Sequence, residues 1–487
     1  MHHVAESLAH FIFFCFAPQT SKSHINTNTA MDPIKRKMWA GLAQGALSLA
    51  AHMDGTAFPY KPLQDGEIRL AHFSRVGNQL HCRLEHVSQS IPDYHALSYV
   101  WRWRPRGGQN YEMKSLYING KKVRIPANLA DFIDTITQLW TPVPPFWVDA
   151  ICINQNNFAE KNTQVRRMLE TYKGASHIIV WLGKHDESSK TCVENIKRWH
   201  NLVLQFTHRH PGWEEMKAPA RGWLYEIGVL DSTNNRLVDR EAWTDFASFF
   251  ETRQWWQRVW TAQEYCIPKA EKTFLCGDSA ISHQCLCDAV FLADLIMGST
   301  DDAEFLSLPM HLATATENLR QMYHTPAPEP PSLYERWNGC RFERTPIWLH
   351  EALSASRFRR ATDPRDKVFA ILGFLEEPWS QDPLLSIDYA LDVREVFTNA
   401  ALYLLKSSRT LDFLGFVLPP SDQTGASMYP SWVPDWNDLG VAANGILSLP
   451  AIILDMPGAT PVGVSLKPTF FVEGCCSIIS LGVVVSS

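Results

Sequence analysis

The stretch FWVDAICINQNNFAEKNTQVRRMLETYKGASHIIVWLG, residues 146–183, has two apolar runs separated by an amphipathic segment. Its first and last eight residues are almost continuously apolar and are bounded by turn residues, a pattern typical of strands buried on both faces. Between the two runs, Asn157 is placed to cap a helix, Glu160 stands three residues later, and Gly174 is placed to end the helix. Strand, helix and strand in this order predict an α/β fold with a mostly parallel sheet flanked by helices.

The residues before this stretch predict further strands and one helix. A third apolar run, 94–101, is bounded by a proline and a polar loop, which favours another buried strand. KSLYINGKKVRIP, residues 114–126, has an Asn-Gly pair between two strand-like segments, the strongest short signal for a β-hairpin. Gly77 and Asn78 separate two more segments with strand-like alternation. Residues 127–140 then repeat apolar side chains at helical spacing.

The chain after the first stretch carries an aromatic and acidic segment. REAWTDFASFFETR, residues 240–253, predicts a helix, and QWWQRVWTAQEYC, residues 254–266, either continues it or begins a second helix. On helical geometry, Trp256, Trp260 and Glu264 share one face. This arrangement would put the carboxylate at the edge of an aromatic surface.

The rest of the chain after residue 183 has a less regular pattern of apolar residues. Residues 184–240 are polar, and we predict no element there. Residues 272–297 predict a strand and hairpin followed by a helix, and the proline-rich run 324–340 indicates an internal boundary. Helices are predicted in RATDPRDKVFAILGF, residues 360–374, and in VREVFTNAALYLLKSS, residues 393–408, which makes this region rich in α-helix.

Charge and hydropathy restrict the partners. The chain has 51 acidic and 45 basic residues, a formal net charge of -6, and no long basic run, which argues against nucleic acid as a partner. The apolar segment 8–17 is too short to span a bilayer, and Glu6 precedes it without any Lys or Arg, so we predict neither a signal peptide nor a membrane span. The first thirty or so residues are polar and turn-rich beyond this segment and are predicted to be disordered.

The cysteines indicate a reducing compartment, because their number, 11, is odd and they are scattered without the dense spacing of a disulfide scaffold. The nearest approach to a metal site is HQCLC, with His283, Cys285 and Cys287. Its C-x-C spacing is not that of a zinc finger, and no second ligand pair follows, so no metal is predicted. Cys152 has no identifiable histidine partner in the sequence and is not predicted to be a nucleophile.

Several motifs in fixed order resemble one family. ALSYVW, WVDAICINQ, EKNTQVRRMLETYKGASHIIVWLG, RVWTAQE, ATDPRDKVFAILG and YPSWVPDW occur here as in fungal heterokaryon incompatibility (HET) domain proteins, over residues 94–436 with the core at 94–264. The resemblance implies a fungal cytoplasmic protein of non-self recognition, whose HET domain triggers programmed cell death when incompatible hyphae fuse. The implied partner is a second copy of the chain or another incompatibility protein.

The resemblance and the element pattern together divide the chain into three parts. Residues 1–57 are predicted to be a disordered or weakly structured extension, and residues 58–266 to form the HET domain. Residues 267–487 are predicted to form a mixed α/β accessory region that continues the family motifs.

The resemblance also implies a chemistry. HET domains are similar to TIR domains, flavodoxin-like modules of immunity, some of which cleave NAD with a glutamate in a W-x-x-x-E pattern. Trp260 and Glu264 have this spacing, so the resemblance assigns the catalytic role to Glu264, with NAD as candidate substrate and no cofactor. Two positions differ: Thr261 stands where those TIR domains usually have cysteine, and Arg102 follows Trp101 where HET domains commonly have glycine.

Elementary chemistry sets the requirements of such a site. Cleavage of the nicotinamide–ribose bond passes through a sugar cation, which needs a nearby negative group and aromatic walls that exclude water. Glu264 would supply the charge, and Trp260 or Trp101 would pack against a ring. The alternative is that Glu264 is a solvated helix residue paired with Arg258, since charged helix residues are mostly exposed.

The ends of predicted strands supply the other candidates. Asp149 lies where open α/β sheets bind ligands, although it could equally cap neighbouring backbone N–H groups. Asp363, Arg365 and Asp366 are interpreted as a helix cap with a salt bridge. The sequence thus leaves two hypotheses, an NAD hydrolase or a non-enzymatic, self-associating signalling module. The predicted site comprises catalytic Glu264 and the ligand-binding residues Ser98, Trp101, Asp149, Arg258 and Trp260.

Overall fold

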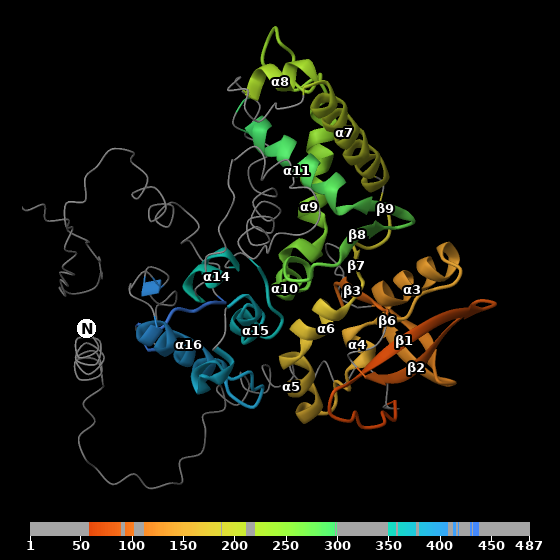
Figure 1. Ribbon diagram of the computed structural model, residues 1–487, viewed down its shortest axis with the longest axis vertical. Helices are drawn as coiled ribbons and strands as arrows, with labels where there is room; N and C mark the ends of the chain where they lie inside the picture. The colour runs from red at the N-terminus through yellow and green to blue at the C-terminus, as the bar shows by residue number, and fades with distance from the viewer. Residues whose placement is uncertain are drawn as a thin grey trace, which may run out of the picture.

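The described residues form one mixed sheet, which is drawn at the lower right of Figure 1, and helices pack on both of its faces. The computed structural model describes residues 58–88, 93–101, 112–186, 188–210, 220–297, 349–356, 359–375 and 379–407, with the short pieces 299, 413–414, 417, 429–430 and 432–437. The predicted extension 1–57 and the proline-rich run 324–340 lie outside the described residues.

Within the described residues the sheet has nine strands. They are β1 (Glu67–Val76), β2 (Gln79–Ser88), β3 (His95–Tyr99), β4 (Met113–Ile118), β5 (Lys121–Pro126), β6 (Phe146–Trp147), β7 (His177–Trp181), β8 (Glu271–Cys276) and β9 (Ser279–Ser282). The α-helices are α3 (Ala127–Leu139), α4 (Asp149–Cys152), α5 (Phe158–Arg166), α6 (Met168–Gly174), α7 (Ser189–Arg209), α8 (Ala220–Glu226), α9 (Arg240–Thr252), α10 (Trp260–Cys266), α11 (His283–Met297), α14 (Leu349–Ser356), α15 (Asp366–Phe369) and α16 (Val393–Ser407). Short 3₁₀ helices include η2 (Gln254–Gln257) and η4 (Leu372–Phe374).

The strand order is β5-β4-β2-β1-β6-β3-β7-β8-β9. The four neighbours β6-β3-β7-β8 are all parallel, and numbered by their place in the chain they run 2-1-3-4. This is the beginning of the flavodoxin-like order 2-1-3-4-5. Toward the two edges, β1–β2, β1–β6, β4–β5 and β8–β9 pair antiparallel, whereas β2–β4 pair parallel. The α/β prediction is therefore confirmed, but the sheet is mixed and not mostly parallel as predicted, because antiparallel hairpins extend it on both sides of the parallel centre.

The predicted hairpins form as expected. Asn119 and Gly120 both have positive φ, 46° and 81°, as the two central residues of a type I′ turn require. Gly77, with φ of 58°, joins β1 to β2. Strands β8 and β9 lie C-terminal to the boundary predicted at residue 266, and both pair into the same sheet.

Helices cover the two faces because successive crossovers run in opposite directions across the sheet. The connection from β3 to β6 carries α3, and that from β6 back past β3 to β7 carries α5 and α6, so right-handed crossovers put them on opposite faces. The two residues of β6 show the division. Phe146 packs against Phe132 of α3, and Trp147 packs against Tyr172 of α6. Helix α10 lies on the α6 side, against β3.

A second group of helices, α7, α9 and α11, packs beside the β8–β9 end of the sheet (Figure 1). Its core contains Trp199 of α7 stacked on Trp243 of α9, with ring centroids 3.8 Å apart. Helix α7 spans 21 residues of the segment in which no element was predicted, so that prediction was wrong.

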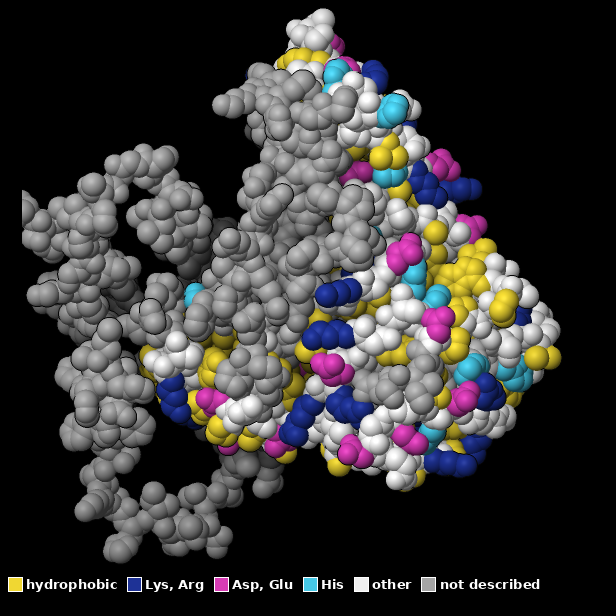
Figure 2. Space-filling model, viewed as in Figure 1, with side chains coloured by type: hydrophobic (Ala, Val, Ile, Leu, Met, Phe, Trp, Pro, Cys, Tyr) yellow, Lys and Arg dark blue, Asp and Glu magenta, His cyan; other side chains and the backbone are white. Residues whose placement is uncertain are grey.

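On the face drawn in Figure 2, basic and acidic side chains interleave over the described surface.

Two predicted elements differ in detail from the structure. The apolar run from Phe146 forms a strand of only two residues, and Asp149 begins the short helix α4, because an apolar run alone does not distinguish a strand from a buried helical turn. The helix predicted after Asn157 is interrupted at Arg167 into α5 and α6. Its cap is confirmed, since the Asn157 side chain accepts the backbone N–H of Glu160 at 3.1 Å.

The segment 254–266 begins a second helix after a break. The backbone leaves helical geometry at Arg253 and again at Arg258, so Trp256 lies in η2 and Trp260 starts α10. These two tryptophans therefore do not share a helix face, contrary to expectation. At the second break, Arg258 forms a parallel β-bridge with Arg360, a residue of the C-terminal segment.

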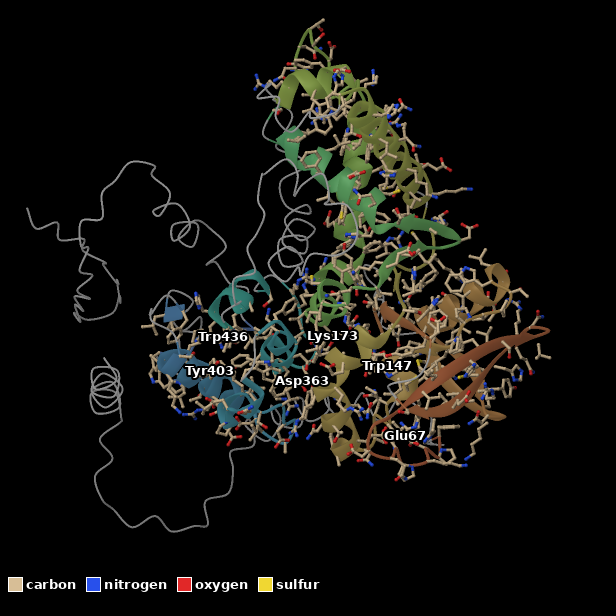
Figure 3. All side chains as sticks on the ribbon, viewed as in Figure 1. Glu67, Trp147, Lys173, Asp363, Tyr403 and Trp436 are labelled. Atoms are coloured by element: carbon tan, nitrogen blue, oxygen red, sulfur yellow. The ribbon has the colours of Figure 1, made fainter. Side chains whose placement is uncertain are left out.

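The C-terminal helices α14, α15 and α16 lie on the far side of α6 and α10 from the sheet (Figure 1). In Figure 3, Trp147 of the sheet and Asp363 of this segment lie on either side of Lys173, at the end of α6. In the part of the chain that is described, no helix is both long and apolar enough to cross a membrane.

Candidate functional site

Glu264 lies in the interior, between α10 and β3. Its residue is only 3% exposed, and the Ser98 hydroxyl donates a hydrogen bond to its Oε2. Ser98 in turn accepts the indole N–H of Trp255 at 2.8 Å. The interpretation of Glu264 as a solvated helix residue is therefore wrong.

The local folding of β3 and α6 explains this placement. Ser98 and its neighbour Leu97 alternate across the sheet, so the Ser98 hydroxyl faces α10 while its neighbour's side chain faces the opposite layer. Tyr172 of α6 donates to the Leu97 carbonyl at 3.0 Å, and its hydroxyl is also within hydrogen-bonding range of the Glu264 carboxyl group. The Glu264 carboxyl group therefore lies between the Ser98 hydroxyl of β3, which Trp255 holds in place, and the Tyr172 hydroxyl of α6.

Asp149 supplies a second carboxyl group at the end of β6. Its Oδ2 accepts the indole N–H of Trp101 at 2.7 Å, and its Oδ1 accepts the backbone N–H of Ala150 at 2.7 Å. The expected backbone-capping role is therefore present on one oxygen, and the other oxygen holds the tryptophan that follows β3. Asp149 and Trp101 both remain partly exposed, unlike Glu264.

Arg258 provides the positive charge of the site. Its Nη1 donates to the Tyr99 carbonyl, the last of β3, at 2.5 Å. Its charge acts on both carboxyl groups and lowers the pKa of each. One cation therefore offsets part of the repulsion between two neighbouring acids.

Together these effects bring the pKa values of Glu264 and Asp149 close to neutral pH. Burial raises the pKa of Glu264 to about 7, and the charge of Asp149 adds to the rise, while Arg258 and the hydrogen bonds from Ser98 and Tyr172 oppose it. The carboxyl end of Asp149 is enclosed although the residue is partly exposed, and this burial raises its pKa to about 6, against the opposing effects of Arg258 and Trp101. Two interacting carboxyl groups that titrate near pH 7 are suited to proton transfer and to stabilising a cation.

Trp260 contacts a different part of the molecule from the Glu264 carboxyl group. Its side chain lies near Asp366 of α15 and lowers the pKa of that carboxyl group, which also accepts the Tyr389 hydroxyl at 2.6 Å. Burial raises the pKa of Asp366 to about 6. Five of the six predicted site residues thus gather around the two carboxyl groups, and the sixth joins α10 to the C-terminal segment.

The C-terminal segment holds α10 and its preceding loop in place. Arg359 is buried, and its Nη1 donates to the carbonyls of Trp256 and Arg258 at 3.1 and 3.2 Å. Gly373 packs so closely on α10 that an added Cβ would lie 2.8 Å from Nε2 of Gln263. The position of Glu264 therefore depends on residues about a hundred positions later in the chain.

Sequence reasoning missed Trp255 and Tyr172 as parts of the network. Tyr172 lies in the amphipathic segment that ends at Gly174, and nothing in this pattern distinguishes a core tyrosine from one that contacts a carboxyl group. Trp255 and Trp256 are adjacent, and only the 3₁₀ geometry of η2 decides which indole reaches Ser98.

The other side chains singled out in the sequence lie apart from the two carboxyl groups. Across the described ranges, no three His, Cys, Asp or Glu side chains converge as a metal site. His283 lies 2.6 Å from the Tyr265 hydroxyl and 3.4 Å from the Cys287 sulfur. Burial raises the pKa of Cys152 to about 12, so its thiol stays protonated at neutral pH. Asp363 and Arg365 form the expected salt bridge, at 2.6 Å.

These features define an α/β protein with a buried pair of carboxyl groups at the carboxyl ends of its parallel strands. Residues 94–264 match the family described as "Heterokaryon incompatibility protein (HET)", so this part of the chain is similar to HET domains. It is 25% identical over 395 residues to "Heterokaryon incompatibility protein 6, OR allele" of Neurospora crassa. This match covers 71% of the chain and 53% of the relative, so the chain spans about half the length of that protein. No solved structure matches the chain.

Proposed function

We propose that this chain acts in fungal heterokaryon incompatibility and that its HET domain cleaves NAD between nicotinamide and ribose, with Glu264 as the essential carboxylate. The match to the HET family and to an incompatibility protein supports the first part. The observation that carries the second part is the buried Glu264, with a pKa of about 7, beside strand β3 of a parallel sheet core. Cytoplasmic action and programmed cell death belong to the same proposal.

The geometry suggests how the residues would divide the work. In the transition state, positive charge develops on the ribose, and ionised Glu264 would stabilise it. Arg258 keeps a fraction of the carboxyl group ionised at neutral pH by opposing the effect of burial. Trp101 and Asp149, both partly exposed, form the outer part of the site, where a flat ring and ribose hydroxyls would bind. Water completes the reaction, giving nicotinamide, ADP-ribose and a proton.

Glu264 is covered in this conformation, so the proposed reaction requires α10 to move away from β3. Self-association is the proposed trigger, because α10 also contacts the C-terminal segment through Trp260 and Asp366. A change in that segment would be transmitted directly to the helix that carries Glu264. The same proposal therefore takes a second copy of the chain, or another incompatibility protein, as the partner.

The test is nicotinamide release from NAD by the purified full chain, alone and fused to a module that forces dimerisation. We expect release from the forced dimer and loss of release in Glu264→Gln, which keeps the side-chain volume. Glu241→Gln on α9, where the glutamate is exposed, is the matched control and should retain activity. An inactive forced dimer contradicts NAD cleavage, and equal activity in Glu264→Gln contradicts the assignment of the residue.

One observation favours a second candidate, a non-enzymatic signalling module. The hydrogen bonds from Ser98 to Glu264 and from Trp255 to Ser98 also serve to fasten α10 to the sheet. In a module of this kind, Glu264→Gln would leave the incompatibility reaction of a fungal strain intact, because glutamine can still accept the Ser98 hydrogen bond. Loss of the reaction in this variant, with the folded protein still present, favours the enzyme.

A further inference from the structure

Three side chains that can carry charge lie at the contact between α7 and α11. Figure 1 shows these two helices beside the β8–β9 end of the sheet, whereas α10, the helix of Glu264, packs against β3. Nδ1 of His200 lies 2.5 Å from Oδ2 of Asp288, and Gln284 donates to the other oxygen of Asp288 at 2.8 Å. The Asp288 side chain is 1% exposed, whereas that of His200 is 17% exposed. A buried carboxylate thus orients a histidine that reaches toward the surface.

The thiol of Cys285 lies within interaction range of the same histidine, because each group affects the pKa of the other. Cys285 and Asp288 are three residues apart on α11, so their side chains share one face of the helix and both can contact His200. In this arrangement the Asp288 carboxylate orients the His200 imidazole, and the imidazole activates the Cys285 sulfur. This Cys285–His200–Asp288 triad joins two helices that the predicted site does not include.

The electrostatic environment favours the thiolate form of Cys285. Its interactions with Asp288, which accepts a hydrogen bond from the ring, and with Cys285 raise the pKa of His200 to about 10, so its ring is an imidazolium at neutral pH. Burial alone would raise the pKa of Cys285, but the hydrogen bonds from His200 and Ser282 and the charge of His200 outweigh burial and lower it. Cys285 also lies in the first turn of α11, where the positive end of the helix favours an anion.

The other described cysteines contrast with Cys285. All of them are buried, whereas Cys285 is partly exposed. Burial raises the pKa of the thiols of Cys82, Cys152, Cys192 and Cys276. Reactivity of a cysteine requires both thiolate character and access. Within the described residues, Cys285 combines the two.

We propose that the Cys285–His200–Asp288 triad is a covalent modification site at which Cys285 reacts with small hydroperoxides. The thiolate sulfur attacks one oxygen of hydrogen peroxide, the S–O bond forms as the O–O bond breaks, and Cys285 becomes a sulfenic acid. Sulfur loses two electrons, and the peroxide gains them. His200 gives its proton to the departing hydroxide, which leaves as water, and the imidazole is then reprotonated from solvent. Asp288 keeps the imidazole oriented throughout.

The test measures the reactivity of each cysteine in the intact full chain. Brief alkylation with iodoacetamide at a series of pH values, followed by peptide mass spectrometry, gives the midpoint for Cys285. Hydrogen peroxide followed by dimedone, which traps sulfenic acids, reports the oxidation itself. In the wild type we expect Cys285 to be the first site labelled by both reagents at pH 6.5, on the order of tenfold faster than Cys287.

Variants then assign the effect to the triad. His200→Gln is expected to shift the alkylation midpoint of Cys285 upward and to slow dimedone labelling about tenfold. Asp288→Asn should act in the same direction, and His208→Gln, an exposed histidine on α7, is the matched control that leaves both unchanged. If a variant fails to fold, the pH dependence of Cys285 alkylation in the wild type still tests the proposal. The proposal is overturned if Cys285 alkylates with the midpoint of an ordinary thiol, or if peroxide leaves it unlabelled by dimedone.

Discussion

Replacing Glu264 with glutamine should stabilise the protein at alkaline pH. The pKa of Glu264 rises from 4.5 to about 7 on folding, because its carboxyl group is buried. Between these values the unfolded chain has lost the proton and the folded chain still holds it, so the stability that Glu264 contributes is complete below pH 4.5 and is lost as the pH rises through 7. A shift of about 2.5 pKa units at ~1.4 kcal/mol each amounts to about 3 kcal/mol.

Glutamine has no such titration but can still accept the Ser98 hydrogen bond, so the advantage of Glu264→Gln over the wild type should grow from about zero at pH 4.5 to about 3 kcal/mol at pH 8. Urea unfolding followed by tryptophan fluorescence at both pH values measures the difference. Glu241→Gln, at an exposed glutamate, should change stability by no more than about 0.5 kcal/mol at either pH. A Glu264→Gln variant that is equally stable relative to wild type at both pH values would refute a buried, titrating carboxyl group.

Three further substitutions probe the same region. Ser98→Ala removes the hydroxyl donor to Glu264 and leaves the Trp255 N–H without its acceptor, so the free energy of unfolding should fall by about 1–3 kcal/mol in urea titrations at pH 7. Trp255→Phe removes the N–H and also leaves a cavity where the five-membered ring was, so a loss of about 2–4 kcal/mol is expected by the same method. Gly373→Ala brings a methyl group against Gln263 and should lower the melting temperature, with a cost of about 1–3 kcal/mol; an unchanged melting temperature would show that Gln263 moves aside freely.

The sequence predicts those parts of the fold that short-range patterns determine. The Asn119-Gly120 turn needs only two residues that tolerate positive φ, and the cap at Asn157 needs only a nearby backbone N–H. The βαβ unit follows from apolar runs of strand length on either side of an amphipathic helix. These features depend on neighbours in the chain, so a single sequence contains enough information to place them.

The rest depends on distant contacts. The break at Arg258 that separates η2 from α10 is fixed by a β-bridge to Arg360, about a hundred residues later. Ser98 and Glu264 are 166 positions apart in the chain. The sequence therefore identifies both as candidate site residues, but it does not predict that they contact each other. Helix α7 escaped prediction because polar residues surround its apolar stripe, whose partner Trp243 lies on another helix.

The most direct measurement is the protonation of Glu264 itself, observed in the infrared. A difference spectrum of wild type minus Glu264→Gln isolates the carboxyl C=O band of this residue from that of Asp149 and the exposed acids. If Glu264 is enclosed as described, its protonated-carboxyl band persists at pH 6 and disappears with a midpoint at about 7. A difference spectrum with no protonated band above pH 5 would contradict it, because such a carboxyl group would be in contact with water and not enclosed between α10 and β3.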